Sequence, residues 1–329
     1  MRAALAVVAA ACLVTLAGCG QAGEGHRGSE RPAPVVVYLA SEDDEYLTEL
    51  IKDYEFEADV DLVVRRGAAD TIVQGLITKR IDPPADVLVT RSVADIQRAA
   101  THGALRPLAA EGVEPPVPGW LRDPDGFWVG LGFRIAVMAY DPAAVEPGAG
   151  VSYPALANSD FKDRLCLSSS RNPVNRALIA QLIAAQDART AEITVRAWIV
   201  NLARPVFESD AEVLDAIAAR NCAIGIVSSA ALARPDAGLS VAVPVPAFAD
   251  ADAVGIGRHA RNPDGAAALV SWLLAPEAQQ RLAAQTRDYP ASPAAQVPAG
   301  LPVCGGQNAS LATWHIEDAE QLAERAHYP

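Results

Sequence analysis

Residues 35–64 read VVVYLASEDDEYLTELIKDYEFEADVDLVV, an alternation of short apolar runs with an amphipathic segment that decides the fold class. This strand–helix pattern occurs three times in a row with short connections, which predicts an α/β fold with a mainly parallel sheet flanked by helices. The predicted strands cover residues 35–39, 61–64 and 86–89, and the predicted helices cover residues 43–55, 70–79 and 93–102.

A second alternation follows a Pro-rich stretch at residues 105–124 and predicts a second α/β lobe. Its predicted strands cover residues 135–140, 164–167 and 223–227, and its predicted helices cover residues 174–185, 190–202 and 210–219. The apolar runs 241–245 and 253–257 are expected to lead back to the first lobe, and helices are expected over residues 263–274, 276–286 and 316–326.

Together the two lobes are expected to form a hinged clamshell, joined by two long strands near residues 135–140 and 241–257. We predict lobe 1 from residues 35–136 plus 253–329, and lobe 2 from residues 137–252. Because ligands of such sheets bind beyond the carboxyl ends of the strands, a ligand site is expected in the cleft between the lobes.

The first residues have the features of a secretory signal, since Met1-Arg2 precedes an apolar run too short to span a membrane as a mature helix. Leu16-Ala17-Gly18-Cys19 resembles the lipobox of bacterial lipoproteins. This implies a signal peptide over residues 1–19 and attachment of an acyl chain such as palmitate at Cys19. Residues 20–34 are polar and rich in Gly and Pro, as expected of a flexible tether. We expect an extracytoplasmic, lipid-anchored protein in the periplasm or at the cell surface; an ordinary signal peptide is the alternative.

The amino-acid composition limits the functional classes to which the protein can belong. The 329 residues, of which 51% are hydrophobic, suffice for two lobes with buried cores and exclude global disorder. The net charge of -13 argues against nucleic acid or anionic lipid as the main partner, because both repel an acidic surface.

Three cysteines remain after the signal segment, namely Cys166, Cys222 and Cys304. Cys166 and Cys222 lie in short apolar runs that are predicted to be neighbouring strands, so a disulfide between them is the favoured pairing. Three cysteines permit three pairings, so the alternatives stay open. A metal site at these cysteines is disfavoured because no C-x-x-C spacing or nearby histidine accompanies them.

Several segments together are similar to the ferric-iron substrate-binding proteins of ABC importers. They are PADVL at 84–88, DPDGFWVGL at 123–131 with Arg134, VMAYD at 137–141, RLCLSSS at 164–170, NLAR at 201–204, NPDGAAALVSWLLAPEAQ at 262–279 and YP at 289–290. The resemblance covers nearly the whole chain after the signal. It implies a type II periplasmic-binding-protein fold, a monomer that captures a solute, and delivery to an ABC permease and its ATPase.

The resemblance says less about the ligand than about the fold, because this chain differs from the family at its iron-binding positions. Family members hold Fe(III) through tyrosine phenolates, often a Tyr-Tyr pair that is here Ser228-Ser229. A further family tyrosine is matched by Val174, and a His-Tyr pair by Glu42-Asp43. We therefore expect no resident cofactor and a cargo larger than a bare ion, either a chelated metal or a small organic solute. Iron(III) held by other oxygen ligands or with a bound anion is the alternative.

Some of the candidate site residues suit an anionic group. Ser169, Ser170 and Asn172 precede a predicted helix N-terminus, whose free N–H groups and dipole favour a carboxylate or phosphate. Plain helix capping explains the same residues equally well. Arg134 could bind an anion through two parallel hydrogen bonds, or form a salt bridge between the lobes.

Other candidates suit a cationic or hydroxyl group. Glu42 and Asp43 follow the first predicted strand and could contact a cation, although acids in a first helical turn also favour the helix dipole. Asp70 opens the second predicted helix, and its carboxylate is expected at the cleft. Ser228 and Ser229 end a predicted strand and could offer hydroxyl hydrogen bonds.

The sequence bears on two other functional classes, an enzyme and a sensing lipoprotein. An enzyme is disfavoured because the sequence has no G-x-S-x-G elbow, no H-E-x-x-H and no P-loop. A sensing lipoprotein that reports its ligand to a signalling receptor stays open, because it would use the same closing clamshell.

Overall fold

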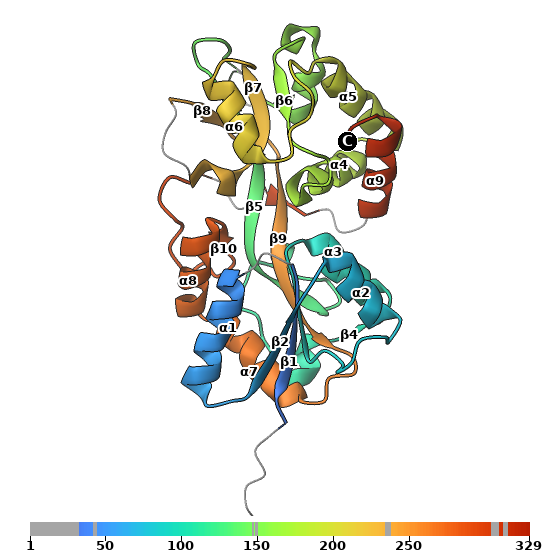
Figure 1. The fold of residues 1–329 in the computed structure, drawn as a ribbon, viewed down its shortest axis with the longest axis vertical. Coiled ribbons are helices and arrows are strands. Elements are labelled where there is room, and N and C mark those ends of the chain that lie inside the picture. Colours follow the sequence, from blue (N-terminus) through green and yellow to red (C-terminus); the bar gives the residue numbers. More distant parts are fainter. Residues whose placement is uncertain are drawn as a thin grey trace, which may run out of the picture. The chain divides into compact units, whose positions relative to one another are not determined.

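A computed structural model describes residues 33–41, 45–146, 148, 151–233, 238–303, 309–311 and 315–329. The predictions for the signal segment, for Cys19, for Glu42 and Asp43 and for Cys304 lie outside these described residues. The described chain forms an α/β fold with two lobes, as the sequence predicts (Figure 1). Within the described residues no helix is both long and apolar enough to cross a membrane.

Lobe 1 is built on a sheet with the strand order β2-β1-β3-β9-β5. Its strands are β1 (Val35–Ala40), β2 (Leu62–Arg66), β3 (Val87–Thr90), β9 (Ala247–Gly257) and the first part of β5 (Trp128–Tyr140). β1 pairs in parallel with β2 and β3, whereas β9 and β5 are antiparallel to their neighbours. All six residues of β1 are buried, because helices cover both faces of the sheet.

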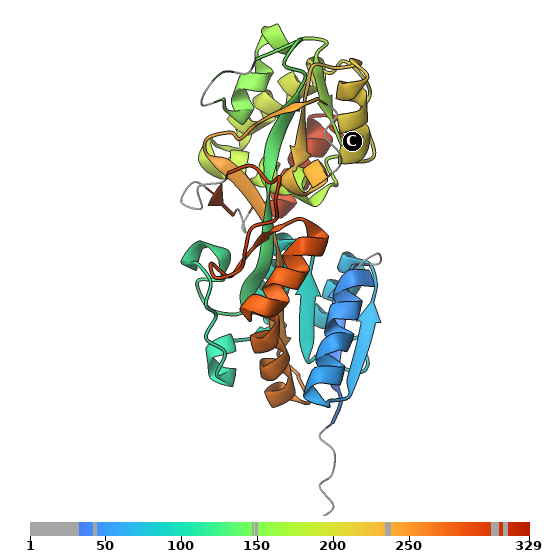
Figure 2. The ribbon, with the colours of Figure 1, turned by 90° about the vertical axis from the view of Figure 1, so that its left-hand side faces the viewer.

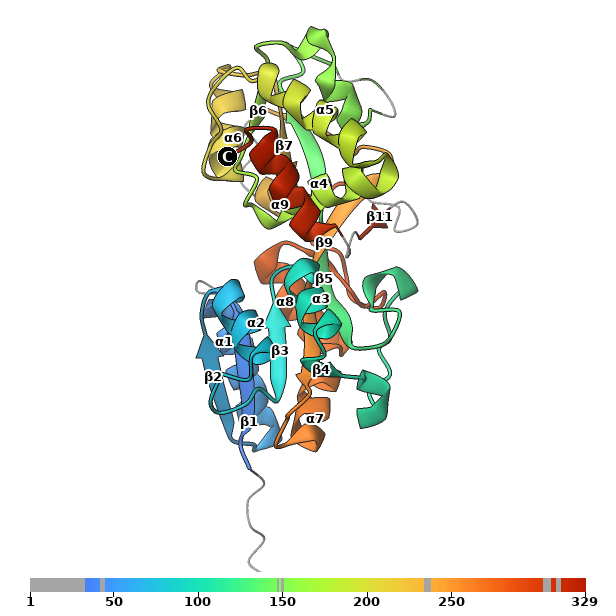
Figure 3. The same cartoon turned by 90° about the vertical axis from the view of Figure 1, so that its right-hand side faces the viewer.

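Five helices flank this sheet: α1 (Glu45–Ala58), α2 (Ala69–Ile77), α3 (Val93–Thr101), α7 (Pro263–Leu273) and α8 (Pro276–Thr286). Figure 2 shows α1, α7 and α8 in front of one face, and Figure 3 shows α2 and α3 in front of the other. The short elements β4 (Leu105–Arg106), η1 (Leu108–Glu111), η2 (Gly119–Leu121) and β10 (Tyr289–Pro290) complete the lobe.

Lobe 2 surrounds the last part of β5, which pairs with β7 (Ile224–Ser228) and β8 (Ser240–Ala242), while β6 (Leu165–Leu167) pairs in parallel with β7. Its helices are α4 (Pro173–Ala185), α5 (Ala188–Val200), α6 (Asp210–Ala218) and α9 (Ile316–Arg325). The remaining elements are η3 (Tyr153–Ala157), η4 (Ser159–Phe161), η5 (Ser229–Ala233) and β11 (Ala309–Ser310).

The C-terminal helix differs from the prediction that residues 253–329 all belong to lobe 1. α9 packs against α4 and α5, and Leu322, Ala323 and Tyr328 are buried in the core of lobe 2 (Figure 3). The apolar face of α9 predicts a packed helix, but it does not identify the lobe on which the helix packs.

β5 and β9 are the long strands that run between the lobes. β5 pairs with β9 over Trp128–Ile135 and with β7 over Ala136–Tyr140, so it passes from one sheet to the other at this point. Both strands extend beyond the predicted runs: β5 begins at Trp128, and β9 is one strand from Ala247 to Gly257. Asp250 and Asp252 interrupt the apolar pattern of β9 although both are buried.

Cys166 on β6 and Cys222 just before β7 form a disulfide, with Cα atoms 6.0 Å apart. The pairing favoured from the sequence is therefore confirmed. The parallel register of β6 and β7 brings Leu165 opposite Ile224, which places the two cysteines on neighbouring chain segments.

Candidate functional site

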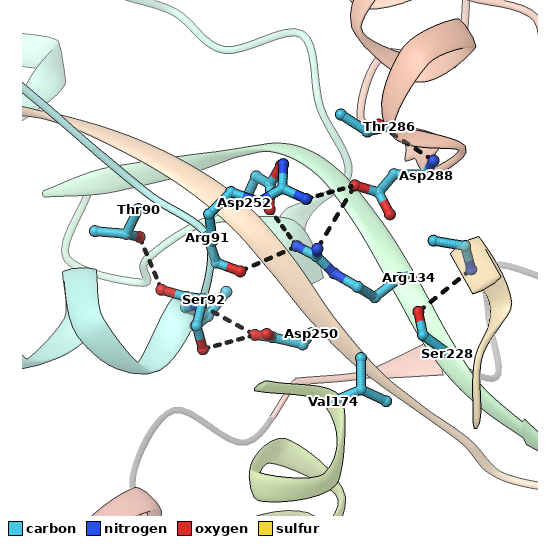
Figure 4. A network of polar contacts seen from close by, with 12 residues as sticks. Thr90, Arg91, Ser92, Arg134, Val174, Ser228, Asp250, Asp252, Thr286 and Asp288 are labelled. Carbon is cyan, nitrogen blue, oxygen red and sulfur yellow. Dashed lines mark hydrogen bonds and ion pairs between the residues drawn. The ribbon is translucent and has the colours of Figure 1, made fainter. Parts of the chain in front are cut away.

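Several strand ends with polar residues meet where β5 and β9 cross between the lobes. Lobe 1 contributes the end of β3, with Thr90, Arg91 and Ser92. Figure 4 shows these residues near Arg134 of β5 and Asp250 and Asp252 of β9, with Val174 of α4 and Ser228 of β7 coming from lobe 2.

The Arg134 side chain lies in an ion-pair network with buried carboxylates (Figure 4). Its Nη2 contacts Asp252 Oδ1 and donates to the Arg91 carbonyl oxygen at 3.0 Å, while its Nη1 lies 3.8 Å from Asp288 Oδ2. Arg91 Nη1 reaches the other oxygen of Asp252 at 2.5 Å. Arg134 therefore forms salt bridges within the lobe 1 part of the crossing strands, and its buried guanidinium is engaged by protein carboxylates. Its predicted contact with an anion and the alternative of a salt bridge between the lobes both stay predictions.

Burial and charge shift the pKa values in this network in different directions. Burial would lower the pKa of Arg134, but the carboxylates of Asp252, Asp288 and Asp250 outweigh it and raise that pKa above its ordinary value. Burial raises the pKa of Asp250 to about 6, although Arg134 and Arg176 oppose the shift. Burial likewise raises the pKa of Asp288. Because both side chains are buried, Asp250 and Asp288 hold a proton more easily than they would in water.

Asp250 also anchors the N-terminus of α3 to the crossing strand. Its Oδ1 accepts hydrogen bonds from Ser92 Oγ at 3.0 Å and from Val93 N at 3.1 Å, whereas its Oδ2 has no hydrogen-bond partner among the described residues. Because β9 runs into both lobes, this bond couples a lobe 1 helix to the hinge strand. The sequence does not point to Asp250, since Asp250 and Asp252 in this Ala-rich run form no known motif.

On the lobe 2 side, one buried carboxylate holds together the groups that end β6 and β7 and begin α4. Asp210 accepts hydrogen bonds from Ser168 Oγ at 2.5 Å, Asn172 Nδ2 at 3.0 Å and Ser228 N at 2.7 Å. Asn172 also caps α4 by accepting from Val174 N at 3.1 Å. Burial raises the pKa of Asp210, and the hydrogen bonds from Ser168, Ser228 and Asn172 oppose this. The structure thus brings the predicted residues Asn172 and Ser228 together through a residue that sequence analysis missed.

The two predicted serines contribute differently. Ser228 is nearly buried, and its hydroxyl oxygen accepts from Ala230 N at 3.3 Å. Ser229 is fully buried and accepts from Ile135 N at 3.1 Å, so it ties the start of η5 to the crossing strand β5. This arrangement places Ser229 in the support of the site and not at its surface, which corrects the prediction of ligand contact.

Ser169 and Ser170 form hydrogen bonds with Pro329 and Tyr328, and their predicted contact with a ligand stays a prediction. Ser169 Oγ donates to the Pro329 oxygen at 3.3 Å, and Ser170 Oγ donates to the Tyr328 oxygen at 3.0 Å. These serines follow a buried strand and precede a helix, which is why their sequence pattern indicates a ligand-binding turn.

Asp70 lies at the first turn of α2 with a highly exposed side chain, and it pairs with Arg98 of α3 at 2.7 Å. Arg98 lies 3.7 Å from Asp95, and Asp95 lies 3.5 Å from Arg176 of α4. Among the described residues Asp70 therefore joins a surface ion-pair chain, and its predicted contact with a ligand stays a prediction. The same chain links lobe 1 to lobe 2 through Asp95 and Arg176.

Within the described part of the chain, no three His, Cys, Asp or Glu side chains group in a way that could hold a metal ion. The N–H groups at the start of α4 and the partly exposed guanidinium of Arg91 suit oxygen atoms of an anionic solute.

A two-lobed α/β protein whose polar strand ends gather where two strands cross between the lobes belongs to the class of hinged solute-binding proteins. Comparison with known families gives the same result. A family profile described as bacterial extracellular solute-binding protein matches residues 35–285. The chain belongs to this family, whose members bind solutes and are not enzymes.

Individual relatives agree with this assignment. The chain is 27% identical over 270 residues to "Iron uptake protein A1" of Synechocystis sp., covering 78% of this chain and 73% of that protein. Among solved structures, the Trichodesmium protein IdiA (FutA) in complex with iron and citrate ligands matches with a TM-score of 0.74 and 23% identity, over 90% of this chain and all of that chain. Apo FutA2 from Synechocystis matches with a TM-score of 0.77 and 21% identity, over 91% of this chain and all of that chain. These structures establish the two-lobed fold.

Proposed function

We propose that this protein is the solute-binding component of an ABC importer and that its cargo is a chelated metal or a small organic anion, not a bare ferric ion. The solute would lie between the lobes, where β3, β7 and α4 end or begin. The closed form would then dock on a permease served by an ATPase. A relative described as an iron uptake protein and a structural neighbour described as holding iron and citrate support the chelate as the first candidate cargo.

The argument against a bare ferric ion rests on the hydrogen bonds and burial of the tyrosine side chains. The chain has seven tyrosines. Four hydroxyls donate to backbone carbonyls: Tyr38 to Pro83, Tyr153 to Ala136, Tyr289 to Pro302 and Tyr328 to Ser168. Burial raises the pKa values of Tyr38, Tyr46, Tyr54 and Tyr328. A ferric tyrosinate needs phenol oxygens that converge on the metal, whereas these four hydroxyls bind separate backbone carbonyl oxygens.

Donor groups at the site suit a carboxylate-bearing chelator better than a cation. The first turn of α4 offers N–H groups at the positive end of the helix dipole, and Arg171 beside it is exposed. Arg91 adds a partly exposed guanidinium at the end of β3. A chelate whose outer atoms are carboxylate oxygens could accept hydrogen bonds from all three.

Closure of the lobes would use the two crossing strands as the hinge. Only β5 and β9 carry long pairings near the boundary among the described strands, so small backbone rotations near Ile135 and Ala249 would change the angle between the lobes. The Asp95–Arg176 ion pair at 3.5 Å would form or break with that rotation, because its partners lie on α3 and α4.

Native mass spectrometry and elemental analysis of the protein as purified test the cargo directly. Calorimetry with ferric citrate, and separately with citrate alone, then measures binding, and solution scattering measures compaction. We expect ferric citrate to bind and compact the protein. R171Q should weaken that binding several-fold, while R189Q, at an exposed arginine in the first turn of α5, should not. Stoichiometric iron that survives exhaustive dialysis against a strong chelator would overturn the proposal, as would binding of no solute from a broad panel.

We further propose that Cys19 carries a lipid and that the protein is monomeric. The lipobox resemblance supports the anchor, and the mass of a tryptic peptide that begins at Cys19 tests it. C19A should release the protein from the membrane fraction; retention of C19A in that fraction would contradict the anchor.

A further inference from the structure

The last two residues of the chain form hydrogen bonds with the serine loop, which we define as residues 168–170. Tyr328 Oη donates to the Ser168 carbonyl oxygen at 2.7 Å, and Ser170 N donates to the Pro329 oxygen at 2.7 Å. Ser170 Oγ adds a bond of 3.0 Å to the Tyr328 oxygen. Tyr328 is only 3% exposed, so its hydroxyl must be satisfied inside the protein, and burial keeps it protonated by raising its pKa.

α9 fixes the position of these two residues on lobe 2. It packs against α4 and α5 with Ala319, Leu322, Ala323 and Ala326 buried, and Arg325 Nε bonds Glu192 of α5 at 2.8 Å (Figure 3). Tyr328 and Pro329 are therefore held beside the serine loop by a packed helix. This segment lies beyond residues 35–285, the part that the family profile matches.

The serine loop is held from two opposite directions. Asp210 binds Ser168 Oγ and Asn172 Nδ2 from the side of α6, and Tyr328 and Pro329 bind the loop backbone and Ser170 from the side of α9. Asn175 Nδ2 completes the support by donating to the carbonyl oxygens of Ser168 and Ser169, each at 3.1 Å. The loop leads directly into Asn172, whose cap fixes the first turn of α4.

We propose that Tyr328 and Pro329 are positioning residues of the solute site: they hold the serine loop so that the N-terminus of α4 presents its N–H groups to the cargo. Ser169 and Ser170 then support the site instead of contacting the solute. This inference rests on the proposed function, because it assigns the role relative to a solute at α4. It adds a segment that lies beyond the part that the family profile matches.

Y328F tests the proposal, because it removes the hydroxyl bonded to Ser168 and keeps the buried ring. Y54F is the matched control: Tyr54 is similarly buried, at 5% exposure, but lies in lobe 1 against Trp272. S170A tests the same link from the loop side. The readouts are amide hydrogen exchange of residues 168–175, the Kd for ferric citrate, and the midpoint of denaturant unfolding.

We expect Y328F and S170A to speed exchange in the serine loop and to weaken ferric citrate binding by roughly three- to ten-fold, as the loss of one buried hydrogen bond predicts. Y54F should leave loop exchange and the Kd unchanged even where it lowers the unfolding midpoint. Wild-type loop exchange in Y328F would overturn the proposal. If the wild-type protein binds no ferric citrate, the proposed cargo fails, while loop exchange in Y328F still decides whether Tyr328 holds the loop.

Discussion

Replacing Asp250 by Asn should change how the stability of the protein depends on pH. Burial raises the pKa of Asp250 to about 6 in the folded protein, against an ordinary value of 3.8. The folded state therefore binds this proton more tightly than the unfolded chain does, so the contribution of Asp250 to stability is fully present below about pH 4 and is lost as the pH rises through about 6. A difference of about two pKa units corresponds to about 3 kcal/mol.

The comparison of wild type with D250N isolates this contribution. Asn keeps an oxygen for the hydrogen bonds from Ser92 Oγ and Val93 N but does not titrate. Its amide nitrogen would replace Oδ2, which has no partner, and this adds an offset that does not depend on pH. We expect the free energy of unfolding of D250N to rise relative to wild type by about 2 to 3 kcal/mol between pH 4 and pH 8.

Equilibrium denaturation by urea at several pH values measures this difference, with D264N at an exposed aspartate of α7 as the control substitution. A difference between D250N and wild type that stays constant within about 0.5 kcal/mol over this range would refute the argument. It would mean that Asp250 ionises in the folded protein as easily as in the unfolded chain, and that the buried network at the crossing strands is differently arranged.

Three further substitutions have expected outcomes. The disulfide between Cys166 and Cys222 closes a loop of 56 residues, so C166A/C222A should lower the free energy of unfolding by about 4 kcal/mol, measured by urea denaturation; no loss would argue against the bond in the oxidised protein. D210A removes the acceptor for the donors of Ser168, Asn172 and Ser228, so it should lower the free energy of unfolding by about 3 kcal/mol or more and weaken ferric citrate binding. D210N should have a smaller effect on both measurements. Equal effects of D210A and D210N would contradict the hydrogen-bond role of Asp210. G225A places a Cβ 2.5 Å from Val213 Cγ1 and 2.9 Å from the Cys166 oxygen, so it should lower the midpoint of thermal unfolding by several degrees. The control G119A, whose added Cβ has no described atom within 4 Å, should leave this midpoint unchanged.

Periodicity in the sequence predicts most elements of this fold because apolar residues mark strands and helix faces directly. Where a strand carries buried charges, that signal fails. In β9 the run Ala247–Gly257 contains Asp250 and Asp252, and a buried strand is recognisable there only once Arg134, 118 residues from Asp252, is known to pair with it. No local pattern holds this information, because the stabilising partner lies on another strand.

The candidate site was predictable to the extent that its residues end a strand or begin a helix. Asn172 and Ser228 follow from that rule, and both lie where β6, β7 and α4 meet. Asp210 begins the helix predicted over residues 210–219, and a helix start indicates nothing about contacts with β6 and β7. The bond between Ser170 and Tyr328 spans 158 residues and had no sequence signal at all.

The buried charges at the crossing strands are better explained by orientation than by stability. A buried ion pair is weak evidence for stability, because desolvation offsets much of the attraction, and here three carboxylates face two close guanidinium groups. What the network does fix is geometry: Arg134 donates to the Arg91 carbonyl, Asp252 holds the Arg91 guanidinium, and Asp250 holds the start of α3. An apolar hinge of the same volume could be more stable, but it would leave the end of β3 free to adopt several positions. Directional bonds from β5 and β9 therefore tie the end of β3 to the lobe 1 side of the hinge near Ile135 and Ala249.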